Sequence, residues 1–162
     1  MDKAMNQAQV LKVAGIDSKH PVMGFLTEIC IPGNYRFRVI VAGATLELLI
    51  NTLIKHHCKK HGKRFVSYTY DSKLLILHEM GILSDNRYRL LNLFKNLLRN
   101  DAAHEHKFEI TKETLSKFPI TITTNQEHYV VSHICIKMVM ELWNEHSNVL
   151  ASYFTGHKGF SP

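Results

Sequence analysis

The chain has 162 residues, which is enough for one domain with a proper core and too few for two comfortable ones. Its hydrophobic fraction of 45% and charged fraction of 21% are close to those of soluble globular proteins, and they exclude a low-complexity chain. The net charge is +6, and one short acid-free segment holds much of it: Lys55, Lys59, Lys60, Lys63 and Arg64.

No membrane or secretion signal is evident in the sequence. The longest uncharged apolar run, residues 39–46, is far shorter than the roughly 20 residues of a membrane span. Residues 1–4 lack the basic start and apolar block of a secretory signal. The cysteines Cys30, Cys58 and Cys135 are odd in number and scattered, so a disulfide framework is not indicated. We expect a cytoplasmic protein without a membrane partner, in which two cysteines are small core residues.

The N-terminal part is the hardest to assign. Residues 3–14 could form a short helix that ends at Gly15. Residues 20–34 carry proline and glycine at intervals and are expected to wrap over the core without regular structure.

The first convincing helix is predicted over residues 35–61, with Asn34 as its N-cap and Gly62 as its stop. Apolar residues recur along it at helical spacing. They are Val39, Leu46, Leu49, Ile50, Leu53 and Ile54.

Two further helices are expected to follow. Asp71 or Ser72 can cap a second helix, and Gly81 fits its C-terminal end. Ser84 or Asp85 can cap a third helix.

The C-terminal part contains a short helical turn and one long helix. Thr111 can cap a turn that stops before Pro119. Residues 120–124 alternate like a strand but have no obvious partner, so we expect an extended crossing segment. Asn125 then caps a last helix over residues 126–154.

Four substantial helices without paired strands predict an all-α fold, a helical bundle of four main helices with an irregular N-terminal segment. The expected organisation is an N-terminal extension over residues 1–33, a single bundle domain over residues 34–155, and a frayed tail over residues 156–162.

The third helix should end within residues 103–107, and its last turns carry Arg99, Asn100 and His104. Arginine offers a fixed fork of donors for phosphate oxygens, and histidine can accept and return a proton near neutral pH. RNA supplies its own nucleophile in the 2′-hydroxyl. One phosphate clamp and one base would therefore suffice to cleave RNA to a cyclic phosphate without a metal or cofactor.

The spacing of these residues limits how they can meet. Asn100 and His104 are four residues apart and share a helix face. Arg99 and His104 are five apart, about 140° around an ideal helix. They converge only if the helix breaks, if the long arginine bends round, or if a second subunit supplies one partner. His106 lies seven residues after Arg99, on nearly the same face, and is a rival to His104. Alternatively, Arg99 is solvated and His104 complements the helix dipole.

The pattern Arg99-Asn100-x-x-x-His104, after the sequence Leu-His-Glu-Met-Gly-Ile-Leu at residues 77–83, resembles the HEPN superfamily. In that superfamily an arginine is followed a few residues later by a histidine. The Gly-Ile-Leu turn and the Ala-His ending look like the branch that contains the mannitol operon repressor family. Residues 44–49 are similar to the first core helix of that branch, where a glutamate recurs; here it is Glu47.

The resemblance implies a HEPN-like helical bundle, often dimeric, with the motif of each subunit near a shared cleft. Many members are metal-independent ribonucleases that act as toxins or antiviral effectors. Carried over, Arg99 would clamp phosphate, Asn100 would orient it, His104 would transfer the proton, and Glu47 would orient or neutralise. RNA, a second copy of the chain and an antitoxin or regulatory protein are the expected partners. Members of the repressor branch are not clearly enzymes, so the alternative is a non-catalytic regulatory module that binds protein or nucleic acid.

The basic segment is a separate candidate. Lys59, Lys60, Lys63 and Arg64 could bind the phosphates of a nucleic acid, or they could complement the negative end of a helix. The histidines within residues 56–61 invite a metal site, but no second pair of ligands has suitable spacing and the lysines would repel a cation. We therefore expect no metal site.

Overall fold

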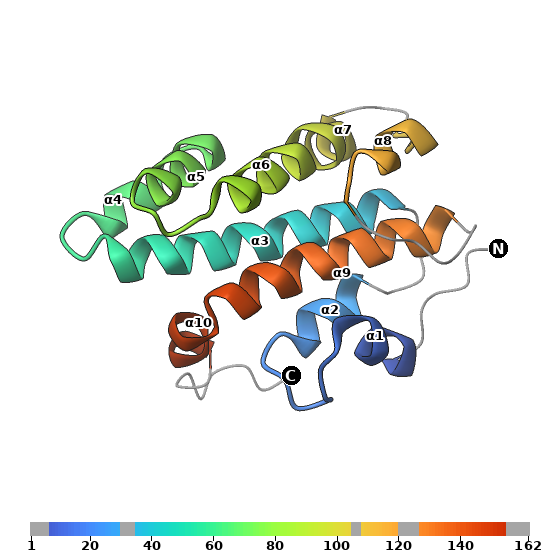
Figure 1. The fold of residues 1–162 in the computed structure, drawn as a ribbon, viewed down its shortest axis with the longest axis horizontal. Coiled ribbons are helices and arrows are strands. Elements are labelled where there is room, and N and C mark those ends of the chain that lie inside the picture. Colours follow the sequence, from blue (N-terminus) through green and yellow to red (C-terminus); the bar gives the residue numbers. More distant parts are fainter. Residues whose placement is uncertain (1–6, 30–34, 105–107, 120–126, 155–162) are drawn as a thin grey trace.

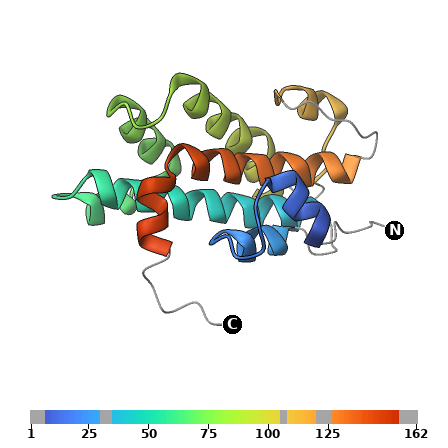
Figure 2. The same cartoon turned by 60° about the horizontal axis from the view of Figure 1, so that its bottom comes forward.

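The structure, a computed structural model, describes residues 7–29, 35–104, 108–119 and 127–154. Within these ranges the regular elements are helices and no strand occurs, which confirms the all-α class. The two longest helices, α3 (Tyr35–His57) and α9 (Glu127–Glu145), lie side by side along the long axis of the molecule (Figures 1 and 2). They form the centre against which the other helices pack.

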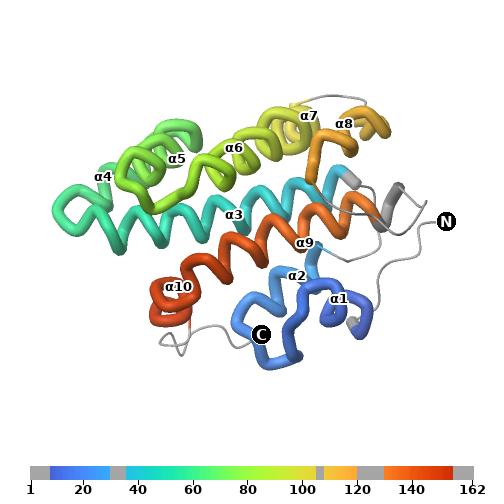
Figure 3. The backbone as a smooth tube through the Cα atoms, viewed as in Figure 1, coloured from blue at the N-terminus to red at the C-terminus, as the bar shows by residue number. Residues whose placement is uncertain are grey.

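The remaining helices surround this pair, and Figure 3 traces the path of the chain through them. They are α1 (Gln7–Ala14), α2 (Met23–Ile29), α4 (Gly62–Val66), α5 (Tyr70–Glu79), α6 (Asp85–Phe94), the π-helical turn η1 (Lys95–Arg99), α7 (Asn100–His104), α8 (Lys112–Ser116) and α10 (Ser147–Phe154). Helices α4 and α7 lie toward opposite ends of α3 (Figure 1). Helix α10 turns across α3 at the end of α9 (Figure 2).

The N-terminal segment contains a helix that the sequence analysis did not predict. Helix α2 lies within residues 20–34, for which we expected no regular structure, and that expectation is wrong. Val22, Leu26 and Ile29 follow one another at helical spacing and are fully buried, because α2 packs against both α3 and α9. Val10 of α1 belongs to the same core cluster, so α1 and α2 share one hydrophobic core with the long helices.

Two long helices end earlier than predicted. Helix α3 stops at His57, because the buried Cys58 starts a turn in which its carbonyl accepts a hydrogen bond from the His61 amide at 3.1 Å. Gly62 begins α4 instead of ending α3, and a Cβ there would lie 3.1 Å from the Cα of Lys55. The last helix is divided at His146 into α9 and α10.

Side-chain caps account for several helix starts. Ser84 and Thr111 cap α6 and α8 as predicted, since each hydroxyl accepts a hydrogen bond from the backbone N–H three residues later. Helix α5 is capped by Thr69, not by Asp71 or Ser72, because the chain enters helical geometry already at residue 70.

Several predictions lie outside the described residues: those for Asn34, Cys30, His106, Asn125 and the tail beyond residue 155. The extended segment over residues 120–124 also lies there. Cys58 and Cys135 are both buried, and we expected two of the three cysteines to be core residues.

The Arg36–His57 stretch of α3 is long enough to cross a membrane, and its most apolar window has a mean hydropathy of 1.7. In this fold 61% of its most apolar window is buried inside the bundle, as in the central helix of a helical domain.

Candidate functional site

The helix that carries the Arg-Asn-His motif changes its geometry where the motif begins. Residues 95–99 form a π-helical turn, in which the Asn100 amide bonds the Lys95 carbonyl. Such turns are rare in proteins, but those that occur are often found at functional sites. Phe94 before the turn, Leu98 within it and Ala102 after it are buried at four-residue spacing, so α7 continues along the core. Arg99 thus follows a core residue while remaining partly exposed.

Arg99 is held on three sides by α3 and α5. Its Nη2 donates a hydrogen bond to Oε2 of Glu47 at 2.7 Å. Its guanidinium carbon lies 5.1 Å from the ring centroid of Tyr70, a cation–π arrangement. Its aliphatic stem lies over Gly43, where an added Cβ would come within 3.0 Å of the arginine Cδ. The structure therefore brings Arg99 and Glu47 together and fixes the direction of the guanidinium.

Glu47 is shared between two cations. Lys73 donates from Nζ to Oε1 of Glu47 at 3.0 Å, and the lysine side chain is only 3% exposed. Burial alone would raise the pKa of Glu47, but the Lys73 hydrogen bond and the charges of Lys73 and Arg99 outweigh it and lower that pKa. One carboxylate facing two cations leaves one net positive charge, so the cluster attracts anions.

Tyr70 and a second ion pair complete the surroundings. Burial raises the pKa of Tyr70 well above its ordinary range, so the phenol beneath Arg99 stays neutral. Lys95 forms an ion pair with Asp71 and adds no net charge.

His104 lies at the end of α7 and is exposed, whereas Asn100 is half-buried. Arg99 is the last residue of the π-helical turn and the helix is α-helical from Asn100 to His104, so the helix does not break between Arg99 and His104. Within the described residues no hydrogen bond joins the two. Two of the three ways in which Arg99 and His104 could meet therefore remain. Either the long arginine side chain bends round, or a second subunit supplies one of the two residues.

The basic segment forms a separate surface. Lys59, Lys60, Lys63 and Arg64 are all exposed and lie where α3 ends and α4 begins. Ten residues of α3, about 15 Å along the axis, separate His57 at this end from Glu47. Beside the lysines is a hollow of about 370 Å³. Its lining residues are His57, Cys58, Lys59, Lys60, His61, Phe65 and Met80.

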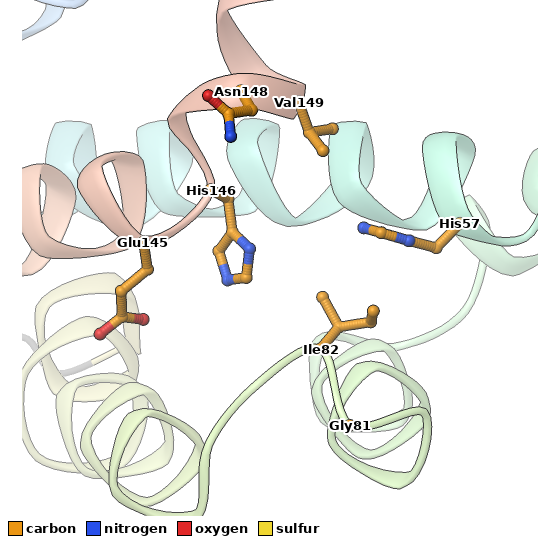
Figure 4. A pocket seen from close by; sticks show the side chains of 7 residues that line it. All are labelled: His57, Gly81, Ile82, Glu145, His146, Asn148 and Val149. Atoms are coloured by element: carbon orange, nitrogen blue, oxygen red, sulfur yellow. The ribbon is translucent and has the colours of Figure 1, made fainter.

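A cavity between histidines lies near the same end and was not foreseen from the sequence. It has a volume of about 290 Å³, and His57 and His146 approach it from α3 and from the junction of α9 and α10 (Figure 4). Among the described residues, no group of three or more His, Cys, Asp and Glu side chains could hold a metal ion.

A buried arginine, also unforeseen, ties α6 to α9. Arg87 donates from Nε and Nη2 to Glu145 at 2.7–3.1 Å and from Nη1 to Glu141 at 2.8 Å. The Arg87 side chain is 6% exposed, so it contributes to the packing of α6 against α9 and not to a surface interaction.

We expect the protein to lose stability in mild acid, because several of its histidines are half-buried. Burial is the main cause that lowers the pKa of His20, His57, His133 and His146. Each folded-state pKa is therefore below the unfolded value of about 6.5, and the unfolded chain binds more protons between the two. The free energy of unfolding should fall as the pH drops from 7.5 to 5.5.

Urea denaturation at several pH values measures this effect. In the variant His146→Gln the fall should be smaller than in the wild type, because one of the histidines with a lowered pKa is removed. A free energy of unfolding that stays constant from pH 7.5 to 5.5 would contradict the prediction.

Comparison of the chain with protein-family models, with curated protein sequences and with solved structures finds no match.

Proposed function

We propose that the protein is a metal-independent endoribonuclease of the HEPN type, in which Arg99, Asn100 and His104 form the reactive group. The observation that supports this proposal is the set of contacts that holds Arg99 in place. Its guanidinium is held by Glu47 and Tyr70, the whole side chain remains 29% exposed, and the arginine belongs to a cluster with one net positive charge. A preorganised, partly exposed cation on the helix that also carries His104 suits a phosphodiester.

The chemistry uses the 2′-hydroxyl of RNA as the nucleophile. Arg99 clamps the non-bridging oxygens, and Asn100 orients the phosphate. His104 takes the proton of the 2′-hydroxyl, and the 2′-oxygen attacks phosphorus. The bond to the 5′-oxygen breaks, that oxygen takes up a proton from solvent water, and a 2′,3′-cyclic phosphate remains. Within this proposal, Glu47 keeps Arg99 in position.

A ribonuclease assay in the presence of EDTA tests the function. Purified protein should cleave single-stranded RNA to products that end in a cyclic phosphate, and His104→Ala should lower the rate by about 10²- to 10⁴-fold. The variant His133→Ala, which removes a half-buried histidine of α9, is the matched control and should retain activity. Intact RNA after incubation of the wild-type protein with several substrates would refute the proposal.

We also propose that the active form is a homodimer in which the two motifs face a shared cleft. Three large apolar side chains of α3, Phe37, Ile40 and Leu48, are 46%, 40% and 38% exposed. Helical geometry places them within a sector of about 80°, adjacent to Glu47. An apolar stripe beside the Arg99 cluster would let a second copy bring its His104 to the same cleft.

Charge on this stripe should prevent dimerisation. The double variant Ile40→Glu/Leu48→Glu would have to bury two carboxylates in an apolar contact, so it is expected to be monomeric. Sedimentation velocity measures the state, and circular dichroism checks that the helices persist. Leu75→Glu, at a side chain that is 48% exposed on α5, is the control and should remain dimeric. A monomeric wild-type protein, or a double variant that still dimerises, would contradict the prediction.

The second candidate function is a non-catalytic regulatory module that binds nucleic acid. The observation that favours it is the exposed, acid-free surface of Lys59, Lys60, Lys63 and Arg64, which lies apart from Arg99. In this case RNA or DNA binding should weaken steeply with salt and in Lys59→Gln/Lys60→Gln, while Arg99→Ala binds like the wild type. Affinity that does not depend on salt would indicate a protein partner, such as an antitoxin or a regulator.

A further inference from the structure

The cavity between His57 and His146 lies at the end of the bundle away from α7 and contains none of the residues of the proposed ribonuclease. It forms where the end of α3, the turn between α5 and α6, and the junction of α9 and α10 meet. Its lining is His57, Gly81, Ile82, Glu145, His146, Asn148 and Val149 (Figure 4). Ile82 and Val149 supply apolar walls, and His57, Glu145, His146 and Asn148 supply polar side chains.

The polar groups of this cavity are arranged to make hydrogen bonds with something other than the protein. The ring of His146 points into the space between Glu145 and His57 (Figure 4). Its Nε2 is buried and has no hydrogen-bond partner in the described part of the chain. Burial lowers the pKa of both His146 and His57, so the two imidazoles are neutral at pH 7 and can donate as well as accept. A buried nitrogen of this kind favours a ligand that can satisfy it.

The second hollow adjoins the first, because His57 lines both. It adds the exposed ammonium groups of Lys59 and Lys60 and contains no carboxylate. Volumes of about 290 and 370 Å³ place the two hollows near the lower limit of small-molecule sites, roughly 300–1,000 Å³. Together they are large enough for one metabolite.

The charges give this combined site a direction. Glu145 and His57 lie on opposite sides of the histidine cavity (Figure 4), and His57 also lines the hollow that Lys59 and Lys60 border. Glu145 is already ion-paired with Arg87, whereas Lys59 and Lys60 are exposed, so an anionic group is attracted to the lysines. Hydroxyl or amino groups would instead make hydrogen bonds with Nε2 of His146.

We propose that the two hollows form one binding site for a small phosphomonoester. Lys59 and Lys60 hold its phosphate, and the uncharged, hydroxyl- or amino-bearing body lies in the cavity between His57 and His146. A free sugar phosphate or nucleotide and the phosphorylated end of an RNA chain share this chemistry. The site is independent of Arg99 and of the cleavage reaction proposed above.

Isothermal titration calorimetry with the whole protein tests the site. The probes are inorganic phosphate, ribose 5-phosphate, AMP and a 5′-phosphorylated 2′-O-methyl trinucleotide, which cannot be cleaved through a 2′-hydroxyl. At least one phosphomonoester should bind ten-fold more tightly than inorganic phosphate, because its body occupies the histidine cavity. The tightest binding by the trinucleotide would identify an RNA end as the source, and the tightest binding by ribose 5-phosphate or AMP a free metabolite.

Variants separate the two halves of the site. His146→Phe should remove the ten-fold advantage without weakening inorganic phosphate, whereas Lys59→Gln/Lys60→Gln should weaken every phosphate probe. His133→Phe, on the same helix α9, is the control and should bind like the wild type. If His146→Phe does not fold, the His57 and His146 ring protons in NMR spectra of the wild type must shift on titration. The proposal is overturned if no phosphomonoester binds more tightly than inorganic phosphate, if the advantage survives His146→Phe, or if these protons do not respond.

Discussion

Replacement of Arg99 by alanine is expected to lower the kcat/KM of RNA cleavage by about 100- to 1,000-fold, the usual cost of removing a preorganised charge from a transition state. The free energy of unfolding should change little. Glu47 keeps its 3.0 Å hydrogen bond to the buried Lys73 when Arg99 is absent, so no carboxylate is left without a partner. Arg99→Lys should also be strongly impaired, because an ammonium cannot form the two parallel hydrogen bonds of a guanidinium.

A fluorogenic single-stranded RNA, cleaved in EDTA, measures kcat/KM for this series. The matched control is Lys95→Ala, which removes a cation one turn earlier whose partner is the exposed Asp71. It should retain activity within a few fold. Equal losses in both variants would show that only the general positive charge matters, and an unchanged Arg99→Ala would exclude Arg99 from the reaction.

Gly43→Ala tests whether the position of Arg99 matters, without removing a charge. The new Cβ would lie 3.0 Å from Cδ of Arg99, so the arginine stem must move by a few tenths of an ångström. Alanine is also favoured over glycine inside a helix by up to about 1 kcal/mol, so the fold should not be weakened. We expect activity about ten-fold lower at unchanged or higher stability. Gly24→Ala in α2, where an added Cβ would meet nothing within 4 Å, should leave activity unaltered.

Local chemistry explains which parts of the fold could be predicted from the sequence. Ser84 and Thr111 were identifiable as caps because the signal is a hydroxyl three residues before a free N–H. Gly81 was identifiable as a helix end, and its φ of +70° is one that other residues rarely adopt. The ends of α3 and α9 carry no comparable signal, since neither Cys58 nor His146 is a helix breaker. Those breaks are set by packing between distant segments.

The same distinction holds for the candidate site. The motif placed Arg99 near a helix end, and the resemblance drew attention to Glu47, which the structure brings to 2.7 Å from Arg99. Lys73 and Arg87 were missed because a charged residue in an amphipathic pattern is normally assigned to the surface. Both side chains are buried here. Their burial is explained by ion pairs with carboxylates that lie on other helices. The π turn likewise has no sequence signature.

Arg87→Met is expected to lower the free energy of unfolding by about 2–3 kcal/mol, the largest loss we anticipate from a single charged residue. Arg87 makes four hydrogen bonds to Glu141 and Glu145, and methionine would leave those carboxylates without a cation. The carboxylate side chains are 44% and 40% exposed, so water compensates in part. The loss should therefore be smaller than the roughly 3–5 kcal/mol of a fully buried pair.

Urea denaturation at pH 7.5 measures this loss, and Arg89→Met is the control. Arg89 lies on the same helix but is exposed, and its one side-chain hydrogen bond among the described residues is to Asn86 at 3.4 Å, so its removal should cost less than about 0.5 kcal/mol. If Arg87→Met costs no more than Arg89→Met, the ion pairs do not stabilise the fold. The double variant Arg87→Met/Glu145→Gln should lose less than the sum of the two single losses, because the amide removes the unpaired charge that methionine leaves behind. That non-additivity would separate the ion pair from the packing of the arginine stem between α6 and α9.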